Sequence, residues 1–495
     1  MMVAQIANGF PAGIPSGGGQ SGDSRLVVLS NRAPVRVIAE DGMQRIEPTV
    51  GGVGATFMRL LERRGGLWIA WAGSNKTPAP LMLPADDPRF TMMFPALGER
   101  EISNYYYGMC NCGLWPLMHL MTQNCRFRAS YWGSYRHVNS LFAQLASTQC
   151  RPSDQVWIQD FHLALVPALL RQRRPELPIG LFWHVPFPPE TIFRIFPWRR
   201  ELLEGMLGAD LIGFHIDAYA DHFLDCCETI AGLEVDRRKR EISYQGRRIQ
   251  VGAFPLGVPA DHFATLATSP KVQARAAQIR AGLGTPYIIL GVDRLDYTKG
   301  LLERMRAFER FLEICPEYRR RVAFVQIAVP SRTRMDEYVE LKRQLDEAIG
   351  RTLGRFSTEG WVPIRYYYDQ FEIEELTAFY SAADIALVTP LRDGMNLVAK
   401  EYVATRVAED GMLVLSEFAG AAQELREALV VNPYDAEAIA AALRQGLGME
   451  PREQRTRMRA LRARVSANDL DSWAQGFLKL LAAARPASDR YAAAN

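Results

Sequence analysis

Apolar and polar positions follow two recurring patterns from Arg25 onward. Short, nearly continuous apolar runs are typical of buried strands, and longer segments with apolar residues three or four apart are typical of amphipathic helices. The predicted strands are residues 25–31, 67–73, 155–160, 179–185, 211–215, 287–293, 322–329, 359–367, 385–390 and 412–418. The clearest predicted helices are residues 164–176, 198–209, 301–315, 337–354 and 373–382.

This alternation predicts an α/β fold with parallel sheets wrapped by helices, in which ligands bind beyond the carboxyl ends of the strands. A seam of small residues around 254–286 separates two groups of strands, so we expect two domains with a ligand cleft between them. The expected divisions are a flexible extension over 1–24, domains over 25–260 and 261–475, and a C-terminal tail over 476–495, of which residues 484–495 are expected to be loose.

Composition and charge narrow the choice of partners. The chain has 58 Lys and Arg against 55 Asp and Glu, a net charge of only +3, so neither a nucleic acid nor a membrane is an expected partner. Because a long apolar span and an export signal are both lacking, a cytoplasmic location is expected. Seven scattered cysteines predict reduced thiols, and Cys110 and Cys112 lack a second pair at ligand spacing, so no metal site is predicted.

The first candidate for chemistry is the segment ADIALVTPLRDGMNLVAKEY, residues 383–402. It predicts a buried strand, a turn at Asp393-Gly394 and a helix that starts near Asn396. The first turn of a helix has unpaired N–H groups and a partial positive charge, which favour a bound anion. An ordinary strand-to-helix turn has the same pattern.

Two further segments carry possible anion contacts. In ILGVDRLDYTKG a buried strand is followed by Arg294 and Lys299, which could bind one anion together or form surface pairs with Asp293 or Asp296. In GGVG, residues 51–54, glycines before a helix could aim N–H groups at an anion or serve only as a turn.

A third group of residues suggests a sugar. Arg32, Asp160 and His184 each end an apolar run, a favoured position for active groups in this architecture, although a buried histidine is often only part of the core. Tyr106 and Trp115 lie in an aromatic segment without helical periodicity and could form a sugar-binding wall or pack under a loop. These groups together indicate a phosphorylated or nucleotide-linked sugar as ligand.

Ten motifs occur in the order seen in trehalose-6-phosphate synthases: SNR, GGVG, WIAWAG, WIQDFHL, HVPFP, GADLIGFH, FPLGV, DRLDYTKG, VPSR and LRDGMNLVAKEY. The chain resembles that family over roughly residues 25–475. The resemblance implies a GT-B fold, two Rossmann-like domains facing each other across a cleft. It also implies a retaining transfer of glucose from a nucleotide-sugar donor to a sugar-phosphate acceptor, glucose 6-phosphate, without a metal or another cofactor. We expect a homo-oligomer.

The resemblance also implies residue roles. Arg294 and Lys299 would contact the donor diphosphate, and Asp393 and Glu401 would hold the donor glucose and ribose. The residues assigned to the donor are Gly52, Arg294, Lys299, Asp393, Gly394, Met395, Asn396, Leu397, Val398 and Glu401. Those assigned to the acceptor are Arg32, Trp71, Tyr106, Trp115, Asp160 and Arg332, and the catalytic set is Arg294, Lys299, His184 and Asp160.

The family reaction is pictured as a front-side displacement, because no Asp or Glu pair suited to a glycosidase nucleophile stands out. Gln159, Phe161, Cys110 and Pro259 depart from the family pattern, which usually has His, Tyr, Ser and Asp there. Two alternatives remain: a glucosylglycerol-phosphate synthase using glycerol 3-phosphate, and an inactive sugar-phosphate sensor. UDP is the default donor nucleotide, with ADP and GDP open.

Overall fold

The computed structural model describes residues 25–40, 43–48 and 52–484, which belong to two compact units. The N-terminal unit comprises residues 1–254 and 475–495, and the C-terminal unit runs from Pro255 to Ala474. The first division thus falls between Phe254 and Pro255, earlier than the expected boundary after residue 260. The expected extension over 1–24 and the last residues, 485–495, lie outside the described part of the chain.

The sheet of the N-terminal unit is mostly parallel, with antiparallel strands at its edges. In the described residues its ten strands follow the order β10-β11-β12-β9-β8-β7-β1-β4-β6-β5, and all pairs from β12 to β6 are parallel. A separate antiparallel pair is formed by β2 and β3. The strands are β1 Leu26–Arg32, β2 Val35–Glu40, β3 Met43–Pro48, β4 Gly66–Trp71, β5 Leu81–Leu83, β6 Phe90–Met93, β7 Gln155–Gln159, β8 Ile179–Phe182, β9 Leu211–Phe214, β10 Glu234–Asp236, β11 Glu241–Tyr244 and β12 Arg247–Ala253.

The helices of this unit include one unusual segment. They are α1 Gly52–Arg64, α2 Glu99–Glu101, η1 Ile102–Leu114, α3 Trp115–Met118, η2 Thr122–Asn124, α4 Ala129–Gln149, η3 Phe161–Leu163, α5 Val166–Arg173, α6 Glu190–Phe193, α7 Arg199–Met206 and α8 Asp217–Thr229. The aromatic segment, which lacks α-helical periodicity, is a π-helix (η1). Its i→i+5 hydrogen bonds displace side chains from the 3.6-residue pattern, so the sequence pattern missed it.

The expected tail over 476–495 starts inside a helix, because α17 covers Leu470–Ala483. Phe477 on this helix is fully buried and stacks on Trp157 of β7, with ring centroids 4.6 Å apart. A Cβ at Gly180 or Gly213 would come within 2.7–2.8 Å of the Phe477 ring, so both glycines make room for it. The end of α17 therefore belongs to the core of the N-terminal unit.

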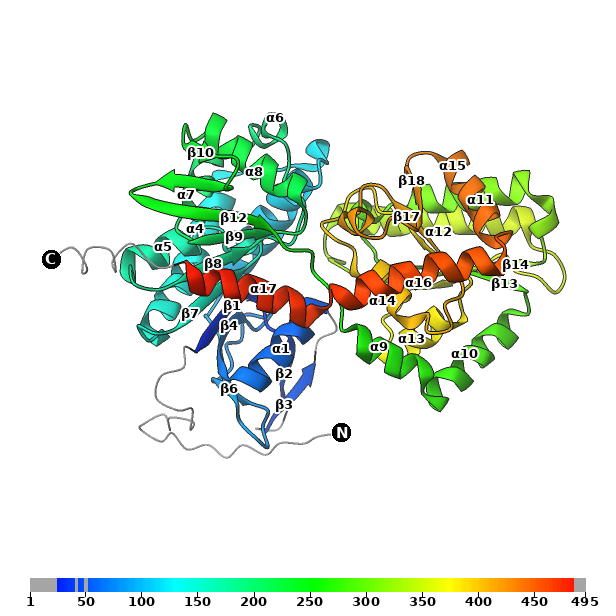
Figure 1. The fold of residues 1–495 in the computed structure, drawn as a ribbon, viewed down its shortest axis with the longest axis horizontal. Coiled ribbons are helices and arrows are strands. Elements are labelled where there is room, and N and C mark those ends of the chain that lie inside the picture. Colours follow the sequence, from blue (N-terminus) through cyan, green and yellow to red (C-terminus); the bar gives the residue numbers. More distant parts are fainter. Residues whose placement is uncertain (1–24, 41–42, 49–51, 485–495) are drawn as a thin grey trace. The chain divides into compact units, whose positions relative to one another are not determined.

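The C-terminal unit has an all-parallel sheet of six strands, in the order β15-β14-β13-β16-β17-β18 within the described residues. Figure 1 shows α11, α12 and α15 on one side of this sheet and α9, α10 and α13 on the other. The strands are β13 Tyr287–Arg294, β14 Val322–Val329, β15 Ile364–Tyr367, β16 Ile385–Val388, β17 Met412–Ser416 and β18 Leu429–Val431. The helices are α9 Ala260–Thr268, α10 Pro270–Leu283, η4 Tyr297–Lys299, α11 Leu301–Ile314, η5 Pro316–Tyr318, α12 Asp336–Phe356, α13 Ile373–Ala382, α14 Leu397–Thr405, η6 Gly420–Gln423, α15 Ala436–Leu447 and α16 Pro451–Ala467.

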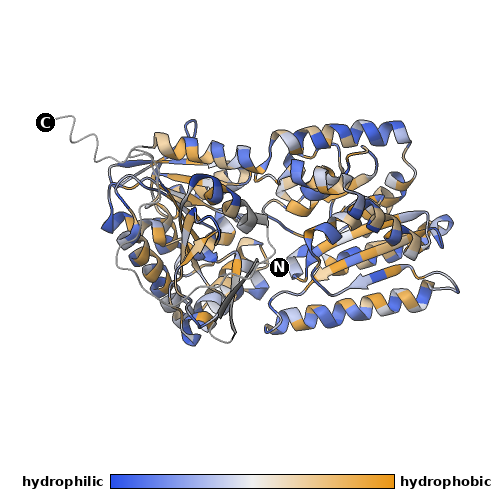
Figure 2. Ribbon diagram, turned by 90° about the horizontal axis from the view of Figure 1, so that it is seen from below, coloured by the Kyte–Doolittle hydropathy of each residue, from blue (hydrophilic) through white to orange (hydrophobic). Residues whose placement is uncertain are grey.

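Hydrophobic burial explains why these segments form these elements. The interior of β14 is buried from Val322 to Ala328, as expected of a strand covered on both faces. Helix α12 instead buries Leu341, Leu345 and Ile349, which are spaced to share one face. Figure 2 shows the same contrast, with apolar colour along the strands and both colours on the helices.

The α/β prediction is confirmed, and each of the ten predicted strands coincides with an observed one. In the sheet order, β13 lies between β14 and β16, and β8 lies between β7 and β9. The carboxyl ends of β13, β14 and β16 therefore lie at one edge of the C-terminal sheet, and those of β7, β8 and β9 lie at one edge of the N-terminal sheet. In the described part of the chain, the helices are all too short or too polar for a transmembrane span.

Candidate active site

In the C-terminal unit, Lys299 and Asp393 come from two neighbouring strands. Lys299 ends the short helix η4 after β13, and Asp393 follows β16. Lys299 Nζ donates to Asp393 Oδ2 over 2.5 Å, and both side chains are largely buried. Gly300 has φ +65°, and a Cβ there would lie 2.4 Å from the Thr389 carbonyl oxygen, so only glycine lets these two loops approach.

The helix that follows Asp393 begins at Leu397, as predicted. Asn396 caps this helix. Its side-chain Oδ1 accepts from the backbone amide of Ala399 over 3.2 Å, and its side-chain Nδ2 donates to Asp393 Oδ2 over 3.0 Å. Since the cap takes one amide of the first turn, those of Leu397 and Val398 are left as donors that lack a partner within the helix. Lys299 and Asn396, the cap of α14, thus share one carboxylate oxygen. That Lys299 and the first amides of α14 contact one diphosphate stays a prediction.

Gly394 and Met395 complete this turn through contacts with a third strand end. The Ala421 amide donates to the Met395 carbonyl over 2.8 Å, and a Cβ at Gly420 would lie 2.0 Å from the Gly394 carbonyl oxygen. The loop between Asp393 and α14 is therefore fixed against the segment after β17.

Arg332 and Arg294 both interact with the carboxylate of Asp296. Asp296 is fully buried, and its Oδ2 accepts from Arg332 Nη1 over 2.5 Å and from the Tyr338 hydroxyl over 2.9 Å. Burial alone would raise the pKa of Asp296, but Arg332, Arg294 and the Thr298 amide lower it to about 2. Arg294 itself is exposed at the end of β13.

Arg304 is a residue that the sequence prediction missed. It is fully buried, and it donates to Asp293 Oδ2 (2.5 Å), Gln326 Oε1 (3.1 Å), Thr389 Oγ1 (3.1 Å) and the Lys299 carbonyl (3.3 Å). These acceptors lie on β13, on β14, after β16 and on η4. One guanidinium thus connects three neighbouring strands with the helix that carries Lys299. In the sequence, Arg304 shows only as an arginine within the apolar pattern of an amphipathic helix, and that pattern does not reveal its partners.

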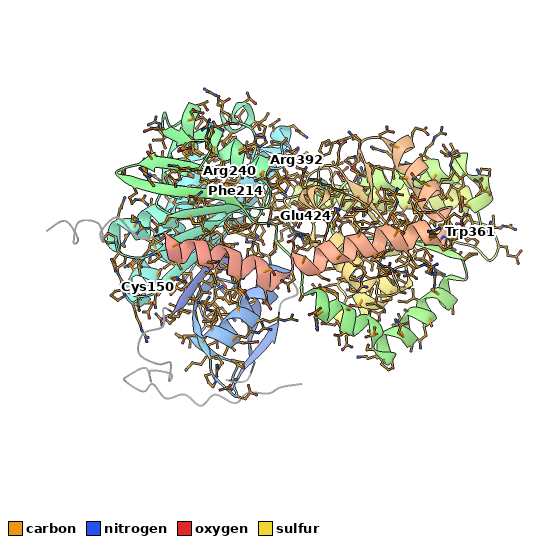
Figure 3. The ribbon with its side chains drawn as sticks, viewed as in Figure 1. Cys150, Phe214, Arg240, Trp361, Arg392 and Glu424 are labelled. Carbon is orange, nitrogen blue, oxygen red and sulfur yellow. The ribbon has the colours of Figure 1, made fainter. Side chains whose placement is uncertain are left out.

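Helix α14 carries two more charged side chains. Glu401 accepts from the Tyr380 hydroxyl over 2.8 Å, and burial raises its pKa. Lys400 on the opposite side is buried, and it donates to Glu424 Oε2 over 2.5 Å and to the Leu256 carbonyl over 2.8 Å. Glu424 is labelled in Figure 3. Lys400, which the sequence prediction missed, holds α14 against the segment that enters the C-terminal unit.

In the N-terminal unit, Arg32 at the end of β1 lies over two aromatic rings. Its guanidinium carbon is 5.2 Å from the Trp71 ring centroid and 5.8 Å from that of Tyr106. A Cβ at Gly73 would lie 2.4 Å from Arg32 Nη2, so this glycine makes room for the guanidinium. The structure thus brings together Arg32, Trp71 and Tyr106, three of the residues that the resemblance assigns to the acceptor. Arg332 belongs to the C-terminal unit.

Trp115 connects to this group through other rings. It is buried, with its ring 4.2 Å from His119 and 6.3 Å from Phe161. Phe161 stacks on His162 at 3.9 Å, and His162 lies 6.5 Å from Tyr106. His162 was missed, although it stands within the WIQDFHL motif.

Asp160 and His184 meet at the ends of β7 and β8. Asp160 has φ +69°, and its Oδ1 accepts from the His184 amide over 3.1 Å. Its Oδ2 lies 3.5 Å from His162 Nδ1. Burial would raise the pKa of Asp160, but His162 and His184 lower it. A strained backbone at such a position is typical of functional sites.

The glycine motif differs from its prediction. Helix α1 begins at Gly52, so Gly52 and Gly54 stand in the helix rather than in a loop before it. A Cβ at Gly54 would lie 3.0 Å from Pro34 Cβ, which indicates close packing. Gly51 lies outside the described residues.

The charged groups described above do not assemble into a metal site. Over residues 25–40, 43–48 and 52–484, His, Cys, Asp and Glu side chains form no group of three or more that could hold a metal ion.

The chain is similar to proteins of known activity. A model of glycosyltransferase family 20 matches residues 24–483. The trehalose-6-phosphate synthase of Mycolicibacterium gilvum (strain PYR-GCK) is 40% identical over 503 residues, 99% of each chain. That of Mycobacterium leprae (strain TN) is 41% identical over 480 residues, 94% of this chain and 96% of the relative.

Solved structures agree with these relatives. A UDP-forming α,α-trehalose-phosphate synthase from Burkholderia xenovorans, in complex with glucose-6-phosphate, has a TM-score of 0.86 at 36% identity, covering 92% of this chain and 100% of that chain. An E. coli structure named as trehalose-6-phosphate and bound with UDP-2-fluoro glucose has a TM-score of 0.85 at 35% identity, covering 92% and 99%.

Proposed function

The chain belongs to glycosyltransferase family 20, and we propose that it transfers glucose from UDP-glucose to glucose 6-phosphate. The products are trehalose 6-phosphate and UDP, and the anomeric configuration is retained. The resemblance of the ten motifs to trehalose-6-phosphate synthases is confirmed by relatives that match nearly the whole chain. The GT-B fold is likewise confirmed by the solved structures.

The observation that carries this proposal is the shared carboxylate of Asp393. Lys299 and Asn396 both donate to its Oδ2, so a cation and a helix start with spare amides lie together at the end of a parallel sheet. That combination suits the diphosphate of a nucleotide sugar. When the donor binds, Lys299 moves its contact from Asp393 to a phosphate oxygen, and Asp393 accepts a glucose hydroxyl instead.

Arg294 and Glu401 serve the two ends of the nucleotide. Arg294 is exposed and adds a second cation to the phosphate site, while Asp296 and Arg332 beneath it form a buried, charge-balanced support. Glu401 receives a ribose hydroxyl, and the Tyr380 hydroxyl fixes its other oxygen. Gly52 is assigned to the donor on the resemblance alone.

The acceptor is proposed to bind in the N-terminal unit. Arg32 supplies the charge for the phosphate, while Trp71 and Tyr106 hold its guanidinium by cation–π contacts. Asp160 receives acceptor hydroxyls, because its lowered pKa keeps it an ionised acceptor. Trp115 and Arg332 are assigned to the acceptor on the resemblance alone.

The chemistry follows from these positions. The bond between glucose and the diphosphate lengthens, and the sugar becomes oxocarbenium-like. Lys299, Arg294 and the start of α14 stabilise the leaving phosphate, whose oxygen takes the proton of the attacking hydroxyl on the same side. Each well-placed group of this kind is commonly worth about 3–4 kcal/mol.

A crossed assay tests the proposal. Purified protein is given UDP-, ADP- or GDP-glucose with glucose 6-phosphate or glycerol 3-phosphate, and products are identified by mass. We expect trehalose 6-phosphate from UDP-glucose and glucose 6-phosphate. Preferential product from glycerol 3-phosphate would instead identify a glucosylglycerol-phosphate synthase, and no nucleoside diphosphate release with either acceptor would indicate a sensor.

Two further properties stay predictions. We infer a homo-oligomer in solution, which light scattering coupled to size-exclusion chromatography measures. A cytoplasmic location follows from the sequence expectation, and cell fractionation with an antibody to the protein tests it.

A further inference from the structure

Three neighbours fix His184: Gln159 and Asp160 at the end of β7, and His215 after β9. Its backbone amide donates to Asp160 Oδ1 over 3.1 Å, and its carbonyl accepts from His215 Nε2 over 3.1 Å. Its ring nitrogen Nε2 lies 2.9 Å from Gln159 Oε1. Gln159 and His215 are each only 2% exposed, so two of these contacts lie in the interior.

The orientation of the Gln159 amide decides which nitrogen of His184 carries the proton. Gln159 Nε2 faces the Trp157 carbonyl at 3.5 Å, and a carbonyl can only accept. Oε1 therefore points to His184, and an amide oxygen is also only an acceptor. Consequently His184 Nε2 must be the donor, and the proton of a neutral ring is on Nε2 rather than Nδ1.

We propose that Gln159 is a positioning residue that holds His184 as the neutral Nε2–H tautomer at the donor sugar. This rests on the proposed function, because His184 matters only if a glucosyl group reacts beside it. An oxocarbenium-like sugar develops positive charge, so an imidazolium at this place would oppose the reaction. A neutral imidazole would not.

The surroundings of His184 agree with a neutral ring. Nδ1, the nitrogen that would take a second proton, is buried. The centroid of the Phe182 ring lies 4.7 Å from that of the His184 ring. Burial lowers the pKa of His184 to about 4, with Asp160 opposing this and His162 adding to it. His215 is a further titratable group that packs against His184, with ring centroids 5.4 Å apart.

The residue type at position 159 determines this behaviour. The family pattern usually has a histidine there, which can donate, accept or become charged. A glutamine side chain does not become charged, so its oxygen remains an acceptor at every pH of interest. We therefore expect this enzyme to keep its activity into acid further than a Gln159→His variant does.

Two measurements test the inference, one of them independent of activity. In the wild-type protein, ¹⁵N shifts of labelled histidines, assigned with a His184→Phe variant, should give an Nε2–H tautomer at pH 7 that titrates near pH 4. In Gln159→Glu, a carboxylate replaces the amide oxygen, and the His184 titration should move up by about one to three pH units. The acid limb of kcat/KM should move upward by the same amount.

Gln155→Glu is the matched control, because it makes the same charge change at the other end of β7. It should leave both the titration of His184 and the acid limb in place. An Nδ1–H tautomer in the wild type, or a His184 titration near its ordinary value of about 6.5, would overturn the inference. So would a Gln159→Glu variant whose His184 titration moves while the acid limb does not. If no trehalose 6-phosphate forms at any pH, the proposed function fails, but the tautomer result still stands by itself.

Discussion

Replacing Arg304 with methionine should destabilise the C-terminal unit more than almost any other charge removal. Arg304 is fully buried and donates to Asp293, Gln326, Thr389 and the Lys299 carbonyl. Methionine has similar length but no donor, so Asp293 would keep a buried carboxylate without its main partner. Burial already raises the pKa of Asp293, which shows how poorly this site tolerates a charge alone.

The size of the effect follows from this loss. Breaking a buried pair by removing one partner costs about 3–5 kcal/mol, because an uncompensated charge remains. For a unit of this size, 1 kcal/mol corresponds to roughly 2–4 °C in Tm, so Arg304→Met should lower the Tm of the C-terminal unit by roughly 6–20 °C. Since the Lys299 carbonyl loses its donor, kcat should fall as well, while the proposed acceptor residues of the N-terminal unit should be unaffected.

Differential scanning calorimetry measures this shift, and two variants sharpen it. Arg343→Met removes an exposed arginine on α12 that pairs with Glu340, and it should change Tm little. The double variant Asp293→Asn with Arg304→Met removes the unpaired charge, so it should recover part of the loss. A Tm within about 2 °C of wild type for Arg304→Met, or a double variant as destabilised as the sum of its singles, would refute the argument.

Three other predictions address the site directly. Lys299→Met should lower kcat by roughly 10²- to 10³-fold with a smaller change in the KM for UDP-glucose, and steady-state kinetics that show the loss mainly in KM would contradict this. Asn396→Ala removes the cap of α14, which is worth about 1 kcal/mol. It also forces alanine to adopt φ +75°, which costs about 1–2 kcal/mol more. Asn396→Gly avoids the second cost, so in thermal melts the glycine variant should be more stable than the alanine variant. Because the pKa of Asp296 is lowered to about 2 from an unfolded value near 4, its contribution to stability is complete above pH 4 and is lost as the pH falls toward 2. Urea unfolding of Asp296→Asn should therefore depend less on pH over that window, and an unchanged slope would exclude this role.

Local patterns predicted the elements of the site because they depend on neighbours in the sequence. The start of α14 is an example: an apolar strand, a turn and a polar cap occur within a few residues, and the helix begins at Leu397 as predicted. Arg294 and Lys299 were likewise predicted from one short segment, because Arg294 ends β13 and Lys299 ends η4, the next element. The π-helix η1 has no α-helical periodicity, and α17 was not predicted, so the sequence patterns missed both elements.

Contacts between distant residues could not be predicted in this way. Arg304 meets Thr389 because β13 lies between β14 and β16, and this strand order is not written in any one segment. The departure at Gln159 was visible in the sequence, but its contact with His184 depends on the parallel pairing of β7 with β8.

The sequence by itself determined the α/β class, the strands and the residues available for sugar-phosphate chemistry, since apolar periodicity and motif spacing are local properties of the chain. The tertiary structure alone decided which charges meet: Lys299 with Asp393, Arg332 with Asp296, and Gln159 with His184. Strand order and register bring these groups within hydrogen-bonding distance, and burial then sets their protonation, because a charge removed from water depends on the partner beside it.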